Sequence, residues 1–213
     1  MKTKLVLWDW NGTLLDDVEL CVDALNRLLA QYHYPQRYTV EAYREIFGFP
    51  IRDYYTRAGF DFSRDPFETL AESYMSLYIP ASAACPLVSG AVPALQALQS
   101  AGVRQTILSA SQLPTLEQQV TARHIRPYFD TLLGLGDIYA ASKVALGQRF
   151  LADAALDPGA AVMVGDSLHD YEVAQALGVR CVLYAGGHQP AKTLRATGAP
   201  VCHSLTEVCA AIL

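Results

Sequence analysis

The sequence predicts an α/β fold: a Rossmann-like parallel sheet core with helices on both faces and an inserted all-helical segment. Three observations predict it. Short apolar runs with β-branched or leucine character recur along the chain. Most of these runs are followed by a helical pattern, and this alternation is typical of a parallel sheet covered on both faces. One long stretch, residues 16–86, contains no convincing strand.

The expected strands occupy residues 4–8, 103–108, 131–135, 161–164, 179–184 and, weakly, 200–202. The helix expected before the second strand illustrates the alternation. Within residues 91–100, the side chains of Ala91, Ala94, Leu95 and Leu98 share one helical face, and Gly102 then ends the helix.

Residues 16–86 are expected to form helices only. Thr39 and Pro66 each begin a helical pattern, and the segment holds most of the chain's 12 Tyr and 7 Phe residues. The chain returns to the sheet at the CPLVSG stretch. We therefore expect a core made of residues 1–15 and 87–213 and a separate helical domain made of residues 16–86. The first helix of that domain has an apolar stripe of Val18, Cys21, Leu25, Leu28, Leu29 and Tyr32.

Composition narrows the class of protein. The 213 residues are 52% hydrophobic, which is enough for a sizeable core, and the net charge of −5 comes without a basic run that could follow nucleic acid. Asp9 interrupts the apolar start well before a signal sequence would be complete, and no run reaches the roughly 18 apolar residues of a membrane span. The five scattered cysteines include no C-x-x-C pair. We expect a cytoplasmic monomer or homodimer with no nucleic-acid or membrane partner.

Candidate chemistry lies at the carboxyl ends of the expected strands, where open α/β sheets bind their ligands. Asp9 follows the first strand, Ser109 the second, and Asp166 and Asp170 the fourth, while Lys143 opens the helix after the third strand. Each has an ordinary alternative as a helix cap, a first-turn charge or a solvated residue. Asp16 or Asp17 is expected to cap the next helix in this ordinary way.

Taken together, these residues indicate a different role. Carboxylates gathered at one sheet edge suit a hard cation such as Mg²⁺, which binds one or two protein carboxylates and leaves room for water and phosphate. A lysine and a hydroxyl complement the remaining phosphate oxygens. The set therefore predicts a site for phosphate and magnesium.

The blocks DWNGTLLD, ILSAS and GDSLHD, with a lysine in the interval between the last two, resemble the haloacid dehalogenase superfamily of phosphohydrolases. The helical segment lies where the phosphoglycolate-phosphatase and phosphoglucomutase-like branch carries its helical cap. Gly48-Phe49-Pro50 followed by Arg52, and Ser89-Gly90-Ala91-Val92, also resemble that branch. The first and last blocks are specific, whereas the serine and lysine motifs are weak on their own. The branch commonly has proline after its lysine, where this chain has Val144.

The resemblance implies a role for each matching residue. Asp9 is the expected nucleophile, which forms an aspartyl-phosphate. Asp9, Asp166 and the backbone carbonyl of Asn11 are expected to hold Mg²⁺, with Asp170 acting through water or by orienting Asp166. Lys143 is expected to neutralise the phosphoryl group and restrain Asp9. The expected substrate-binding residues are Gly12, Thr13, Ser109, Ala110 and Lys143, with Arg52 as the preferred anion contact among the cap arginines Arg44, Arg52, Arg57 and Arg64.

One departure from the family pattern bears on catalysis. Phosphatases of this family have an aspartate two residues after the nucleophile, where it protonates the leaving oxygen and later activates water; this chain has Asn11. An amide donates hydrogen bonds but does not exchange protons near neutral pH. Acid–base help is typically worth about 10²–10⁴-fold in rate. Acyl phosphates, pyrophosphate-like compounds and aryl esters, whose leaving groups need little protonation, would be affected least.

Two hypotheses follow. The first is a Mg²⁺-dependent phosphatase of small phosphorylated metabolites, slowed by Asn11. The second is a catalytically weakened protein of the same fold that binds a phosphorylated ligand or partner and signals by cap closure. A further alternative is that Asn11 was introduced to trap a complex.

Overall fold

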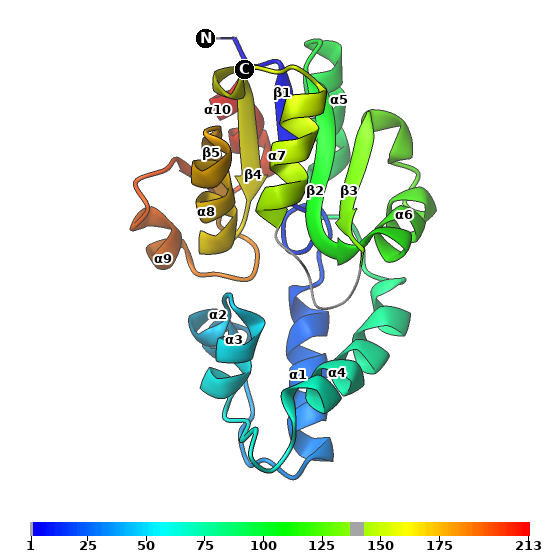
Figure 1. The fold of residues 1–213 in the computed structure, drawn as a ribbon, viewed down its shortest axis with the longest axis vertical. Coiled ribbons are helices and arrows are strands. Elements are labelled where there is room, and N and C mark those ends of the chain that lie inside the picture. Colours follow the sequence, from blue (N-terminus) through cyan, green and yellow to red (C-terminus); the bar gives the residue numbers. More distant parts are fainter. Residues whose placement is uncertain (1, 137–142) are drawn as a thin grey trace.

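The computed structural model describes residues 2–136 and 143–213, and within them six strands form one parallel sheet in the order β3-β2-β1-β4-β5-β6 (Figure 1). The predicted fold class is confirmed. The strands are β1 (Leu5–Trp8), β2 (Arg104–Gln112), β3 (Thr131–Leu135), β4 (Ala161–Gly165), β5 (Arg180–Tyr184) and β6 (Val201–Cys202).

Strand β1 lies in the middle of the sheet, between β2 and β4. Its four residues are fully buried, which is typical of a central parallel strand covered on both faces. The strand order reverses next to β1, so residues that follow β1, β2 and β4 meet at one edge. Strand β2 extends four residues past its predicted end at Leu108, with an irregular register between Leu108 and Gln112.

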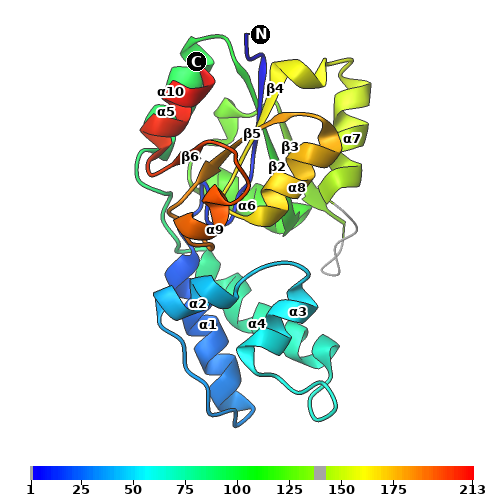
Figure 2. The same cartoon turned by 90° about the vertical axis from the view of Figure 1, so that its left-hand side faces the viewer.

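Two layers of helices enclose the sheet. On one face, Val6 and Trp8 pack with residues of α5 (Ala91–Ser100), α6 (Leu113–Ala122) and α10 (Leu205–Ile212). On the other face, Leu5 and Leu7 pack with residues of α7 (Lys143–Asp153), α8 (Leu168–Leu177) and α9 (Ala191–Arg195). Figure 2 shows α5 and α10 on one side of the sheet and α7 and α8 on the other. Two 3-10 turns, Arg126–Tyr128 and Pro158–Ala160, precede β3 and β4.

The segment between β1 and α5 contains four helices and no strand among the named elements: α1 (Val18–Gln31), α2 (Val40–Ile46), α3 (Ile51–Ala58) and α4 (Phe67–Ser82). Thr39 and Pro66 stand at the N-caps of α2 and α4, as the sequence pattern indicates. These helices share a hydrophobic cluster of their own, built on residues such as Leu25, Tyr43 and Leu70. They lie together beyond one edge of the sheet (Figure 1).

Candidate active site

The strand ends bring four of the predicted site residues into direct contact or close proximity. The Nζ of Lys143 lies 2.6 Å from Oδ1 of Asp9 and 2.6 Å from Oδ1 of Asp170. Asp9, Asp166 and Asp170 each present a carboxylate oxygen within 4.8 Å of the others. All four side chains are buried. Residues up to 161 positions apart in the sequence, from Asp9 to Asp170, therefore form one charged cluster.

The start of α8 fixes the two later carboxylates. Ser167 and Asp170 form a capping box, in which Oδ2 of Asp170 accepts hydrogen bonds from the backbone N–H groups of Asp166 and Ser167 and from the Ser167 hydroxyl. Asp166 accepts hydrogen bonds from the Thr13 hydroxyl at Oδ1 (2.9 Å) and from the His188 N–H at Oδ2 (2.6 Å). Asp170 is thus held by Lys143 and by its own helix, and Asp166 by the loops after β1 and β5.

The cluster contains more negative than positive charge. Burial, together with the charges of Asp170 and Asp166, raises the pKa of Asp9 to about 8 against the opposing effect of Lys143. Burial, with Asp170, also raises the pKa of Asp166 to about 6, although His188 opposes it. Burial acts to lower the pKa of Lys143, but Asp170 and Asp9 outweigh it, so the pKa is raised and the ammonium group stays charged. One lysine among three buried carboxylates leaves room for a further cation, and an all-oxygen donor set suits a hard divalent ion.

Asn11 is held by hydrogen bonds on both sides of its amide. Its Oδ1 accepts from the Ser111 hydroxyl (2.7 Å), and its Nδ2 lies 2.8 Å from Oδ2 of Asp17 and 2.6 Å from the Tyr78 hydroxyl. The Tyr78 hydroxyl donates to the same Asp17 oxygen at 2.7 Å. Because Asp17 is an acceptor, position 11 needs a donor on this side, which an amide supplies and an ionised carboxylate does not.

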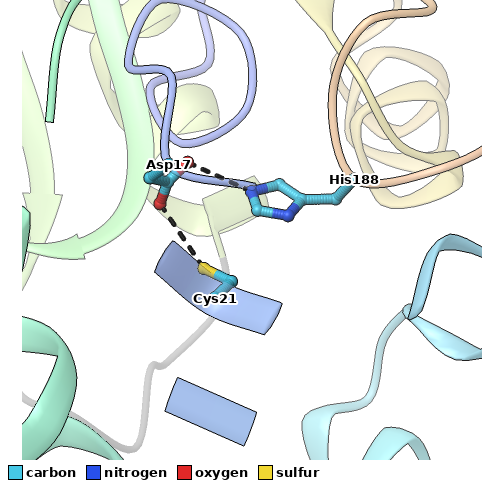
Figure 3. A group of neighbouring side chains, drawn as sticks. All are labelled: Asp17, Cys21 and His188. Atoms are coloured by element: carbon cyan, nitrogen blue, oxygen red, sulfur yellow. Dashed lines mark hydrogen bonds and ion pairs between the residues drawn. The ribbon is translucent and has the colours of Figure 1, made fainter. Parts of the chain in front are cut away.

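Asp17 was expected to serve as a helix cap, if Asp16 did not, and the structure corrects this part of the interpretation. It occupies the N-cap position of α1 but makes no side-chain cap hydrogen bond. Its Oδ1 instead accepts from the Gly12 N–H (2.9 Å) and lies 3.3 Å from Nε2 of His188, while Oδ2 accepts from the Cys21 thiol (3.7 Å; Figure 3). The partners of the carboxylate thus lie in the loop after β1, on α1 itself and in the loop after β5.

Asp17 and His188 form a buried ion pair. Burial acts to raise the pKa of Asp17, but the charge and hydrogen bond of His188, with hydrogen bonds from Tyr78 and Asn11, outweigh it and lower the pKa. Burial acts to lower the pKa of His188, but Asp17 and Asp166 raise it to about 9. Nδ1 of His188 lies 2.8 Å from the Tyr43 hydroxyl. His188 lies four residues after the end of β5, in the loop at the same edge of the sheet, so inspection of the strand ends is the signal that could have selected it.

The predicted phosphate-binding residues differ in how they are placed. Gly12 has φ +71° and its space is filled by the His188 ring, which would lie 2.4 Å from an added Cβ, so the turn requires glycine. The Gly12 N–H is bonded to Leu15 and Asp17, and the Thr13 hydroxyl to Asp166. Ser109 is fully buried and accepts a hydrogen bond from the Ser111 N–H.

A cavity of about 510 Å³ joins this cluster to the helical segment. One end of the cavity is lined by the charged cluster and its neighbours: Asp9, Asn11, Lys143, Asp166, Asp170, Ala110 and Ser111. The hydroxyl that contacts Asn11 belongs to Ser111, a residue that the sequence analysis did not select.

Of the four cap arginines, Arg52 alone is among the described residues that line the cavity. Arg44 donates to the carbonyls of Gly186 and Gly187, Arg57 donates to the carbonyl of Ile46, and Arg64 pairs with Asp65.

Comparisons with known proteins concern the family and the fold of the chain. Residues 6–184 match the family model described as haloacid dehalogenase-like hydrolase. A phosphoglycolate phosphatase from Caulobacter vibrioides is 29% identical over 95% of this chain and 88% of its own length, and the pyrophosphatase PpaX of Bacillus pumilus is 25% identical over 82% and 80%. A haloacid dehalogenase-like family hydrolase from Streptococcus pneumoniae has a similar structure, with a TM-score of 0.85 at 19% identity over 99% of both chains. No helix of the described residues is long and apolar enough to cross a membrane.

Proposed function

The chain belongs to the haloacid dehalogenase-like hydrolases, and from this premise we propose that it is a Mg²⁺-dependent phosphatase of small phosphorylated metabolites, acting through an aspartyl-phosphate on Asp9. The observation that carries the proposal is the buried contact of Asp9 with Lys143, next to Asp166 and Asp170, at the end of a cavity large enough for a substrate. Relatives named phosphoglycolate phosphatase and pyrophosphatase support the same class of reaction.

The excess of buried carboxylate is what a divalent cation would balance. In this proposal Asp9, Asp166 and the backbone carbonyl of Asn11 hold Mg²⁺, and Asp170 positions Asp166 through the hydrogen bonds at the start of α8. When bound, the ion neutralises charge on the phosphoryl oxygens.

The side chains of the chain itself perform the remaining steps. An oxygen of Asp9 forms a bond to phosphorus as the bond from phosphorus to the leaving oxygen breaks, and water then releases phosphate from Asp9. Lys143 holds Asp9 in place and offers positive charge to the phosphoryl group. The Ser111 hydroxyl and the Asn11 amide face the same end of the cavity as hydrogen-bonding groups, and neither of them ionises near neutral pH.

Asn11 limits the proposed rate on substrates whose leaving oxygen needs a proton. Its Nδ2 is directed at Asp17 and Tyr78, and the amide itself supplies no carboxylic acid at the position where the family has its proton carrier. Acyl phosphates, pyrophosphate and aryl esters are less affected, because their leaving groups are weak bases. We further propose that residues 16–86 act as a cap over a core made of residues 1–15 and 87–213, in a cytoplasmic protein that is a monomer or homodimer.

The test is phosphate release from p-nitrophenyl phosphate with and without Mg²⁺. Turnover should depend on the metal and fall to background in Asp9→Asn, while Asp16→Asn, which changes an exposed neighbouring carboxylate, should keep it. Absence of turnover with any phosphorylated substrate, in protein that still binds Mg²⁺, would overturn the phosphatase proposal.

That outcome would support the second candidate, a weakened protein that binds a phosphorylated ligand. The observation in its favour is the hydrogen-bonded network around Asn11, which stabilises an amide at the acid–base position. The binding of inorganic phosphate or phosphonates without turnover would distinguish it.

A further inference from the structure

The part of the cavity that faces the helical segment is predominantly apolar and rich in aromatic side chains. The side chains that line it come from the α2–α3 connection, α3 and α4, and include Phe47, Phe49, Tyr54, Phe67, Tyr74 and Met75. Several of these rings contact one another, for example Phe47 with Tyr54 at a centroid distance of 5.3 Å. A wall of this kind favours flat apolar groups, which contact the faces and edges of the rings.

The same part of the cavity offers no uncompensated cation among its described lining residues. Arg52 is the only arginine among the described lining residues. Its guanidinium is 3.7 Å from the Glu68 carboxylate and lies over the rings of Phe62 and Phe67. Its side chain is 54% exposed, so much of it faces solvent.

The other basic side chains along the lining also have partners. Lys143 is shared by Asp9 and Asp170, and His188 faces Asp17. The His169 ring stacks on Phe49 at a centroid distance of 4.3 Å. A substrate with a second anionic group, such as a carboxylate, would have to place that charge against apolar rings without a dedicated partner, which is unfavourable.

The size of the cavity permits a larger leaving group than a small acid. Its volume of about 510 Å³ lies within the range of roughly 300–1,000 Å³ that is typical of pockets for drug-sized ligands. A cavity of about 150 Å³ is enough to bind benzene. There is room for a phosphoryl group at Asp9 together with one or two rings beyond it.

The chemistry at Asn11 independently favours the same class of leaving group. A phenol has a pKa of about 10, as tyrosine does, whereas that of water is about 15.7 and aliphatic alcohols resemble water. A phenolate therefore departs with little protonation, and replacing the acid–base carboxylate with an amide slows an aryl ester less than an alkyl ester.

From the aromatic lining, the lack of a free cation among the described residues that line this part of the cavity, and the amide at position 11, we propose that the substrates are small aryl phosphate monoesters. The inference rests on the proposed phosphatase function and specifies its substrate class. The ring occupies the aromatic part of the cavity while an oxygen of Asp9 bonds to phosphorus. The P–O(aryl) bond breaks, its electron pair stays on the phenolate oxygen, and this oxygen takes a proton from solvent. Water then attacks the aspartyl-phosphate, and the products are the phenol and inorganic phosphate.

The test compares kcat/KM for phenyl, benzyl and ethyl phosphate and for 2-phosphoglycolate, with Mg²⁺ present. Benzyl phosphate has an aromatic ring but an aliphatic leaving oxygen, so it separates the two causes. Burial of the ring should favour benzyl over ethyl phosphate by roughly 10- to 100-fold. Phenyl phosphate should exceed benzyl phosphate by at least a further 10-fold, and 2-phosphoglycolate should be no better than ethyl phosphate.

Phe49→Leu and Phe62→Leu form a matched pair, because both residues belong to the helical segment and only Phe49 lines the cavity. Phe49→Leu should lower kcat/KM several-fold for phenyl and benzyl phosphate and leave ethyl phosphate unchanged. Phe62→Leu should leave all four substrates unchanged.

Binding measurements decide the inference even if turnover is absent. By calorimetry with Mg²⁺, phenylphosphonate should bind at least 10-fold more tightly than methylphosphonate, and equal affinities would overturn the aryl assignment. A preference for 2-phosphoglycolate over phenyl phosphate would also overturn it while leaving the phosphatase function intact. Absence of turnover with all four substrates and also with acetyl phosphate and pyrophosphate, together with selective binding of phenylphosphonate, would reject the phosphatase function and retain an aryl-phosphate binding site.

Discussion

The substitution Asn11→Asp is the most informative single change, because it places a carboxylate where the structure has a donor. Nδ2 of Asn11 lies 2.8 Å from Oδ2 of Asp17. Two unit charges at this distance repel by about 6 kcal/mol at an effective dielectric constant of about 20, which corresponds to about four pKa units. The new carboxyl group should therefore share a proton with Asp17 at neutral pH instead of acting as a free acid–base group.

The expected result concerns stability and turnover together. A carboxyl group whose pKa is raised in the folded state destabilises the protein as pH rises above its unfolded value of about 4. Chemical denaturation of Asn11→Asp should thus show a lower free energy of unfolding than the unmodified chain at pH 8, with a smaller difference at pH 5. Turnover of ethyl phosphate should rise by less than about 10-fold, well below the full value of an acid–base group.

The double variant Asn11→Asp/Asp17→Asn restores one amide and one carboxylate in exchanged positions. Its turnover of ethyl phosphate should be higher than that of Asn11→Asp. Relative to the unmodified chain, the gain should reach up to about 10²–10⁴-fold. Asp17→Asn alone is the control, and it should gain no turnover. The reasoning would be refuted if Asn11→Asp were as stable as the unmodified chain at pH 8 and matched the double variant in turnover.

Three further predictions concern metal, packing and pH. Mg²⁺ should raise the melting temperature, because it relieves repulsion within the carboxylate cluster. Asp166→Asn should remove most of this increase. Thermal scans with Mg²⁺ or with EDTA measure the melting temperature of each protein. Tyr54→Phe removes a buried hydroxyl that has no hydrogen-bond partner among the described residues, so it should stabilise the protein by about 1 kcal/mol. Tyr34→Phe removes a hydroxyl that is bonded to Asp65, so it should destabilise the protein by a similar amount. Urea denaturation measures both effects, and a change of stability in the same direction for the two variants would contradict the prediction. Because the pKa of His188 is raised to about 9 in the fold, its stabilising effect should be complete below about pH 6.5 and disappear as pH rises through 9, so the stability difference from His188→Gln should shrink over this interval.

The sequence predicted the sheet and the placement of the charged cluster because both depend on local patterns. Apolar runs define the strands, and parallel strands direct their carboxyl ends to one edge, so Asp9, Asp166 and Asp170 could be placed near one another without knowledge of side-chain contacts. Their roles in catalysis and metal binding stay predictions.

The network around Asp17 could not be predicted in the same way. An acidic residue before an apolar helix is fully accounted for by a helix cap, whereas the actual partners Tyr78 and His188 lie 61 and 171 positions away. The directions of the arginine side chains in the helical segment could not be predicted from the sequence either. A helical pattern does not say whether a long side chain lines the cavity or donates to a distant loop. Arg52 does the first and Arg44 the second.

The contacts of α2 with the loop after β5 set a barrier to opening the cavity. Arg44 donates from Nε to the Gly187 carbonyl and from Nη2 to the Gly186 carbonyl, each at 2.8 Å, and the adjacent Tyr43 contacts His188. Any displacement of α2 from this loop must break both charge-assisted hydrogen bonds at the same time, at about 1.5–3 kcal/mol each. The helical segment is therefore tied to the loop after β5 by two bonds that must be broken together, so its separation from this loop is a rare event on the scale of thermal motion.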